Sequence, residues 1–390
     1  MKAEHKRTLC ASYIGYITQA IVNNLAPLLF VIFQRQYGLT VAQIGFLVTF
    51  NFGVQILVDF LAARYAEKIG YKKCIVAAHI FSAAGLLGLG ILPELVGNAY
   101  LGLMLAIGIY AVGSGLIEVL VSSIVQALPL DAKSAAMSLL HSFYCWGHML
   151  VVLLTTVFFC FFGTENWKWL AALWALIPLG NVFLFAKSPV QVPGGKGKGQ
   201  PAGKLLRSGF FWLLAVLMIC SGASEQAMSQ WASYFAEQGL GVSKTAGDLL
   251  GPCLFALLMG LSRLVYGIFG ERIHLKGFIS ASGLACVAGY LLAVFAPHPL
   301  VNLIGCGVCG MSVGIMWPGV FSLAAGYVPS GGTAMFGLLA LAGDLGCSVG
   351  PSVVGSVSSG FGGELKAGLL AAIAFPLVLV LGIQLLRRKQ

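Results

Sequence analysis

Charged residues are scarce in this sequence. Only 9% of its 390 residues are Asp, Glu, Lys or Arg, whereas 58% are hydrophobic. A soluble domain carries about 25% charged residues, so the composition excludes a soluble protein and predicts one embedded in a lipid bilayer. The net charge of +10 is not gathered into a basic patch, which argues against nucleic acid as a partner.

Several sequence patterns are also absent. The short alternating segments of a transmembrane barrel are missing, and so is a phosphate-binding Gly-rich loop with its Lys. The ten cysteines form no disulfide framework, and Cys306 and Cys309 have metal-ligand spacing but no second ligand pair. No catalytic constellation stands out. We therefore expect no enzyme activity, no cofactor, no bound metal and no ATP-driven cycle.

Twelve apolar segments are long enough to cross a bilayer, which takes about 20 helical residues. They fall at 9–33, 40–65, 74–94, 99–127, 135–162, 167–186, 209–236, 243–270, 277–296, 299–326, 332–357 and 365–386. The first continues through Phe33 without the small-residue cleavage pattern of a signal peptide, so we expect it to stay attached. The predicted fold class is all-α: a polytopic membrane protein with twelve transmembrane helices.

Lysine and arginine residues are sorted by loop. If the N-terminus is cytoplasmic, eighteen of the 23 lie in cytoplasmic segments. Arg263 lies within the predicted helix at 243–270, and the residues that remain outside are Arg35, Lys168, Lys244 and Lys366. Basic residues favour the cytoplasmic side of a membrane. The pattern predicts a multi-pass protein of the cell membrane, the cell inner membrane, with both termini cytoplasmic.

The helices divide into two halves that echo each other. A Pro/Gly/Lys-rich segment at 188–208 is expected to be a flexible linker between six-helix bundles at 1–187 and 209–390. Ala66-Glu67-Lys68-Ile69 resembles Gly270-Glu271-Arg272-Ile273, and Gly115-Leu116-Ile117-Glu118 resembles Gly314-Ile315-Met316-Trp317. Two six-helix repeats are typical of secondary transporters.

Acidic residues within the apolar segments suggest the function. Glu118 lies deep in the predicted helix at 99–127, and Glu225 lies deep in the one at 209–236. Placing a carboxyl at such a depth costs roughly 2.5–3.5 kcal/mol of insertion free energy, so it usually faces a polar cavity or an ion path. Asp344, in the predicted helix at 332–357, is nearly as deep and could bind sodium or pair with Arg263. We expect Glu118, Glu225 and Asp344 to take part in ion coupling, to protons or to sodium.

Polar and aromatic residues on helical stripes suggest a binding cavity. A sugar needs donors and acceptors for its hydroxyls and an aromatic surface for its apolar face, and hydrogen bonding between helices is the alternative role for these side chains. The predicted substrate-binding residues are Asn23, Asn24, Asn51, Glu118, His141, Tyr144, Glu225, Ser229, Trp231 and Trp317.

The segment Glu67-Lys68-Ile69-Gly70-Tyr71-Lys72-Lys73 resembles the cytoplasmic loop motif of the major facilitator superfamily. In that family the loop ties helices 2 and 3 to the other bundle when the cytoplasmic side is closed. The resemblance implies a major facilitator fold and a gating role for Glu67. We expect Lys68, Arg263, Glu271 and Arg272 to share that role.

A second resemblance covers most of the chain. The motifs that resemble the fucose:proton symporter group are Asn23-Asn24-Leu25, Gly115-Leu116-Ile117-Glu118-Val119, His141-Ser142-Phe143-Tyr144-Cys145-Trp146-Gly147, Ser262-Arg263 with Gly267, and Trp317-Pro318-Gly319-Val320-Phe321-Ser322-Leu323. The resemblance implies uptake of a hexose or related sugar, with Glu118 handling substrate and proton. Pro27 stands where that group has a helix 1 aspartate, so the resemblance does not carry that group's route of proton coupling over to this chain.

The sequence therefore predicts a secondary transporter that takes up a sugar or similar polyhydroxylated solute with a proton or sodium, by alternating access. One alternative is a proton-coupled exporter of drugs or other hydrophobic or cationic compounds. The many Asn, Gln, Ser and His residues argue against it. A receptor or sensor on the same fold is a second alternative, which the short loops do not favour.

Overall fold

The computed structural model describes residues 3–129, 133–190, 202–269, 274–328 and 331–386. The chain forms two compact units, Met1–Gly194 and Gly195–Gln390, and the boundary falls inside the segment 188–208. Part of that segment differs from the flexible linker expected from the sequence. Helix α7 (Ala202–Leu205) lies within it, and Leu205 is buried because its apolar side chain packs away from water.

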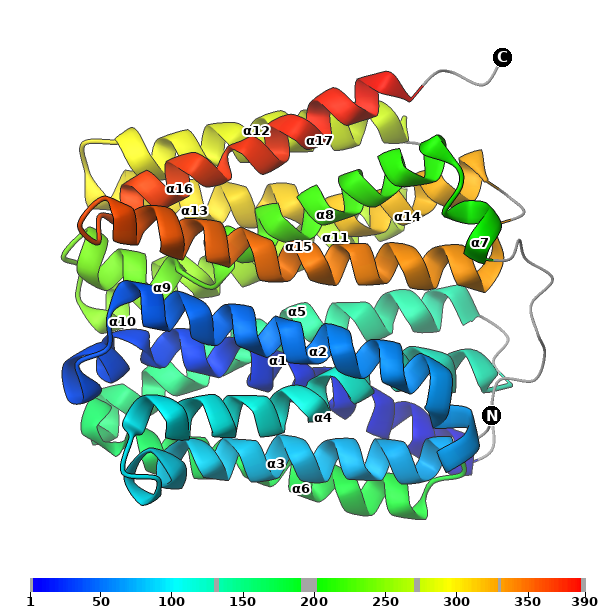
Figure 1. Ribbon diagram of the computed structural model, residues 1–390, viewed down its shortest axis with the longest axis horizontal. Helices are drawn as coiled ribbons and strands as arrows, with labels where there is room; N and C mark the ends of the chain where they lie inside the picture. Colours follow the sequence, from blue (N-terminus) through cyan, green and yellow to red (C-terminus); the bar gives the residue numbers. More distant parts are fainter. Residues whose placement is uncertain (1–2, 130–132, 191–201, 270–273, 329–330, 387–390) are drawn as a thin grey trace. The chain divides into compact units, whose positions relative to one another are not determined.

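The first unit consists of helices only, in the part that the structure describes (Figure 1). These are α1 (Ala3–Tyr37), α2 (Val41–Ile69), α3 (Tyr71–Leu95), α4 (Ala99–Ala127), α5 (Lys133–Phe162), the 3₁₀ turn η1 (Thr164–Asn166) and α6 (Trp167–Lys187). Helix α1 contacts each of the other five long helices. It is also the most buried span of this unit, so its polar side chains face other helices.

The second unit is also helical among its described residues. After α7 it contains α8 (Gly209–Ser229), α9 (Ala232–Tyr234), the π-helical turn η2 (Phe235–Gly239), α10 (Lys244–Asp248), the π-helical turn η3 (Leu249–Cys253), α11 (Leu254–Phe269), α12 (Leu275–Phe295), α13 (Pro299–Val313), α14 (Met316–Tyr327), α15 (Gly332–Gly360), α16 (Leu365–Ala372) and α17 (Ala374–Leu385). Helix α8 holds the position that α1 holds in the first unit. It contacts α13, α14, α15, α16 and α17.

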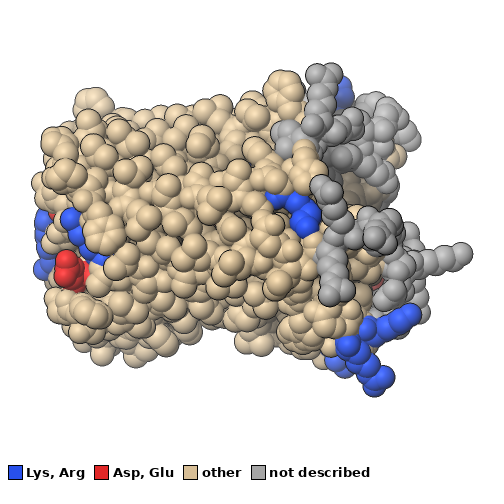
Figure 2. Space-filling view, turned by 90° about the horizontal axis from the view of Figure 1, so that it is seen from above, with Lys and Arg blue, Asp and Glu red and all other residues tan. Residues whose placement is uncertain are grey.

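Twelve spans within the described residues are long and apolar enough to cross a membrane. The predicted all-α fold with twelve transmembrane helices is therefore confirmed. Figure 2 shows a face on which nearly all visible residues are uncharged, with the visible charged side chains toward its two ends. Such a surface suits hydrocarbon, because lipid tails solvate apolar side chains and not charges.

Three spans that the sequence predicts as continuous helices are interrupted near prolines. The eighth divides into α10, the π-helical turn η3 with Pro252, and α11. The tenth span divides into α13 and α14 four residues before Pro318, and the twelfth divides into α16 and α17 just after Ala372, the residue four before Pro376. Proline has no backbone N–H for the carbonyl four residues earlier, but it is tolerated in the first turn of a helix. The tenth and twelfth spans therefore each start a new helix two residues before the proline, which lies in its first turn.

Helices α8 and α15 pack backbone to backbone through glycines. A Cβ added at Gly346 would lie 2.0 Å from the carbonyl oxygen of Ile219, and one at Gly350 would lie 2.4 Å from that of Ala223. Contacts this close admit no side chain. Small residues of this kind let membrane helices associate tightly.

We predict that Gly346→Ala destabilises the protein by about 1–3 kcal/mol, because the added methyl group forces α8 away from α15. The measurement is thermal unfolding of the purified protein in detergent. Gly337→Ala is the matched control, since a Cβ there meets nothing within 4 Å on the same helix. Equal melting temperatures for both variants would contradict the close contact.

Candidate functional site

A row of polar pairs joins α1 to α4 in the first unit, and we call it the α1–α4 seam. Its three pairs are Tyr16 Oη with Ser122 Oγ at 2.8 Å, Gln19 Nε2 with Glu118 Oε2 at 2.8 Å, and Asn23 Oδ1 with Ser114 Oγ at 3.5 Å. On each helix the members follow one another at three or four residues, so they share one face. The fold thus gathers polar groups along a single helix-to-helix contact.

Glu118 has a neutral partner. Gln19 Nε2 donates to its carboxyl, and no Lys or Arg forms an ion pair with it in the part of the chain that the structure describes. The side chain is only partly buried. A membrane carboxyl without a basic partner is a natural acceptor for a proton or another cation.

Asn23 connects the seam to α2. Its Oδ1 accepts from Gln55 Nε2 at 3.0 Å and from Asn51 Nδ2 at 3.4 Å. The hydroxyl of Ser114 donates to Gln55 Oε1 at 3.0 Å. The structure therefore brings the predicted residues Asn23 and Asn51 together with two neutral polar partners.

The sequence prediction missed Tyr16, Ser114 and Ser122. A serine in a membrane helix often bonds its own backbone, which makes a lone serine uninformative. Ser114 and Ser122 lie four residues before and after Glu118, and this spacing is the signal that places them on its face.

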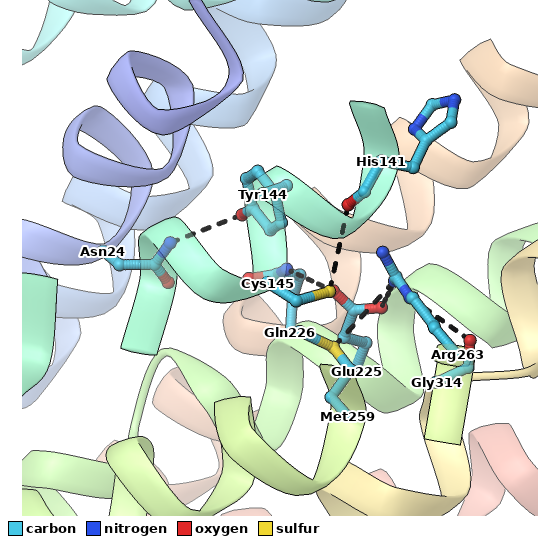
Figure 3. A network of polar contacts seen from close by, with 9 residues as sticks. All are labelled: Asn24, His141, Tyr144, Cys145, Glu225, Gln226, Met259, Arg263 and Gly314. Atoms are coloured by element: carbon cyan, nitrogen blue, oxygen red, sulfur yellow. Dashed lines mark hydrogen bonds and ion pairs between the residues drawn. The ribbon is translucent and has the colours of Figure 1, made fainter. Parts of the chain in front are cut away.

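Helix α5 places its predicted residues against α1. Asn24 Nδ2 donates to Tyr144 Oη at 3.4 Å and to the carbonyl of Ala20 at 2.9 Å, and Figure 3 shows the contact with Tyr144. The His141 ring lies edge-on to Tyr16, with ring centroids 5.3 Å apart. His141 itself is exposed and Tyr144 half-buried, so both rings border the seam without being sealed inside it.

In the second unit Glu225 forms an ion pair. Arg263 Nη2 lies 3.4 Å from Glu225 Oε2, and Gln226 Nε2 donates to the other carboxyl oxygen at 3.2 Å (Figure 3). Gln230 Nε2 donates in turn to Gln226 Oε1 at 3.0 Å. Glu225 thus differs from Glu118, because it is buried and has a cationic partner.

The other polar positions of α8 are buried too. Ser229 is the last residue of the helix, and the hydroxyl of Ser221, one turn before Glu225, has no hydrogen-bond partner among the described residues. Ser221, Glu225 and Ser229 follow one another at four residues and share one face of α8, and their role in binding stays a prediction.

The two predicted tryptophans have different surroundings. Trp231 is fully buried, and its indole N–H donates to the carbonyl of Pro351 at 3.1 Å. Trp317 is partly exposed and lies against α15, where a Cβ added to Gly343 would come within 2.2 Å of its ring. Asp344 follows Gly343 and is 8% exposed. In this conformation Trp231 makes a helix-to-helix contact, whereas Trp317 is partly exposed with its ring against α15.

The residues expected to form a gate are only partly described. Glu67 and Lys68 are exposed at the end of α2, and Gly70 makes the turn into α3 with φ +102°, a conformation that side chains disfavour. Glu271 and Arg272 lie outside the described residues. Gating by Glu67, Lys68 and Arg263 stays a prediction.

Comparisons with known proteins agree with this architecture. The sequence model of the Major Facilitator Superfamily matches residues 12–351. Membrane protein MosC of Rhizobium meliloti is 26% identical over 169 residues, which span 43% of this chain and 41% of MosC, less than half of that relative.

Two solved structures share the fold. A bacterial homologue of the human lysosomal transporter Spinster superposes with a TM-score of 0.78 at 14% identity, with 98% of each chain covered. FucP, the Escherichia coli fucose:proton symporter, superposes with a TM-score of 0.67 at 17% identity, with 99% of this chain and 100% of FucP covered.

We predict that Gly343→Ala moves the Trp317 ring off α15, because the added methyl group occupies the place of the ring. The measurement is tryptophan emission, taken as the difference between each protein and its Trp317→Phe partner. We expect the Trp317 contribution to shift to longer wavelength as the ring meets water. The same difference should stay unchanged in Gly337→Ala, and an unshifted Gly343→Ala spectrum would contradict the predicted displacement.

Proposed function

Because this chain belongs to the Major Facilitator Superfamily of membrane transporters, we propose that it takes up a sugar or a similar polyhydroxylated solute by secondary active transport. In this proposal a proton or sodium ion enters with the solute, and the binding site opens alternately to the two sides of the cell membrane. Both termini lie in the cytoplasm.

The observation that supports coupling best is the surroundings of Glu118. Its carboxyl is bonded to a neutral amide, Gln19, within a seam of neutral polar groups. A charged carboxyl in this setting costs free energy that binding of a cation would remove. We therefore assign ion loading to Glu118, with Asp344 as a second candidate, and the surroundings allow either a proton or sodium.

The neutral polar groups support a polyhydroxylated substrate. Asn23, Asn24, Asn51, His141 and Tyr144 of the first unit offer both donors and acceptors, as sugar hydroxyls require. From the second unit we assign Glu225, Ser229 and the partly exposed Trp317 to the substrate. Trp317 is a better stacking surface than Trp231 in this conformation, because the ring of Trp231 is fully buried.

The test is counterflow in proteoliposomes with radiolabelled hexoses, deoxyhexoses and amino sugars, without an ion gradient. We expect the parent protein and Glu118→Gln both to exchange a sugar, because counterflow needs binding and alternation but no coupling. Uptake driven by an imposed proton or sodium gradient should be lost in Glu118→Gln only. The gradient that drives uptake by the parent protein identifies the ion.

Glu364→Gln is the matched control, because Glu364 is an exposed carboxyl at the start of α16. It should keep both exchange and gradient-driven uptake. Absence of exchange with every sugar, in protein that is folded, would reject the sugar proposal and favour the exporter of hydrophobic or cationic compounds. Gradient-driven uptake that persists in Glu118→Gln would move coupling to another acid.

A further inference from the structure

The interruption of the tenth span leaves one backbone carbonyl without its helical partner. Pro318 lies four residues after Gly314 and has no N–H to donate to the Gly314 oxygen. The span accordingly breaks between Val313 and Met316. In a membrane such a carbonyl must find a donor elsewhere, because lipid offers none.

Arg263 of α11 provides that donor. Its Nε donates to the Gly314 carbonyl at 3.2 Å (Figure 3). The approach is close, since a Cβ at Gly314 would lie 2.8 Å from the Met259 oxygen and 2.9 Å from Cβ of Ser262. Glycine at this position lets α11 come near enough for the guanidinium to reach the break.

The same guanidinium also bonds Glu225 of α8, because Arg263 Nη2 donates to Glu225 Oε2 at 3.4 Å. A planar guanidinium can bond a carboxylate and a carbonyl at once with fixed geometry. We call Glu225, Arg263 and Gly314 the Arg263 brace. It connects α8 and α11 to the point where α13 ends and α14 begins.

We propose that the Arg263 brace positions α14 and, three residues beyond the break, Trp317. In this role Glu225 is a positioning residue that acts through Arg263. An ion or solute that binds Glu225 alters the bond between Arg263 and the Gly314 carbonyl. The position of the Trp317 ring then changes with it. The importance of that ring for transport rests on the proposed function, whereas the positioning does not.

The test is a double-mutant cycle between Arg263→Lys and Pro318→Ala. Lysine keeps the positive charge for Glu225 but cannot donate from the Nε position. Alanine at 318 restores the backbone N–H that the Gly314 carbonyl lacks. The readout is the Trp317 contribution to emission, taken as before from Trp317→Phe partners, because the chain has seven tryptophans.

We expect Arg263→Lys to shift the Trp317 emission to longer wavelength and to weaken solute exchange roughly tenfold, the effect of one orphaned carbonyl. Adding Pro318→Ala should return both to parent values. Adding Pro178→Ala, which changes a helical proline of α6 in the other unit, should restore neither. The emission arm needs no substrate, so it stands even if no sugar is exchanged.

Two results would overturn the inference. One is an unchanged Trp317 emission in Arg263→Lys. The other is no recovery in the double variant when Pro318→Ala alone resembles the parent. Glu225→Gln gives a check that does not involve Pro318: the brace requires a Trp317 shift like that of Arg263→Lys, and a parent-like spectrum there contradicts it.

Discussion

The constraint on which this structure depends is the need to pair every backbone polar group inside a bilayer. Continuous helices meet it along most of their length. At two places where a helix ends or breaks, a side chain from a neighbouring helix bonds the backbone carbonyls there. Asn302 of α13 donates to carbonyls of Leu292, Ala293 and Ala296 at the end of α12, and Arg263 serves the break at Gly314. Polar residues in the helices therefore follow from backbone needs as well as from substrate.

The two deep glutamates differ in whether their charge supports the backbone. Glu225 belongs to an ion pair that also stabilises a broken helix, so losing its charge would disturb backbone packing. Among the described residues Glu118 bonds to the amide of Gln19 in a neutral seam, and no backbone carbonyl depends on that pair. The acid that can change charge with little structural cost suits coupling, and the acid with a backbone role suits signalling between helices.

The sequence predicted the helices and their number well, because hydropathy and length report directly on the bilayer. It also identified Asn23, Glu118 and Glu225 as polar groups in apolar segments. It could not choose the partner of Arg263, because Glu225 and Arg263 are far apart in sequence and only helix packing brings them together. The break at Gly314 can be predicted from the sequence, because Pro318 lies four residues after it. The seventh span also breaks, at Gln230 and Trp231 between α8 and α9, and no proline nearby predicts that break.

The spacing of the α1–α4 seam limits how these two helices can move. Turning α1 by one residue rotates its side chains by about 100°, which would take Tyr16, Gln19 and Asn23 away from their partners together. Sliding by less than a full turn would also separate the three pairs, which are bonded at 2.8–3.5 Å. The three pairs therefore favour one register of α1 against α4. A rearrangement within this unit that keeps the three pairs moves α1 and α4 together.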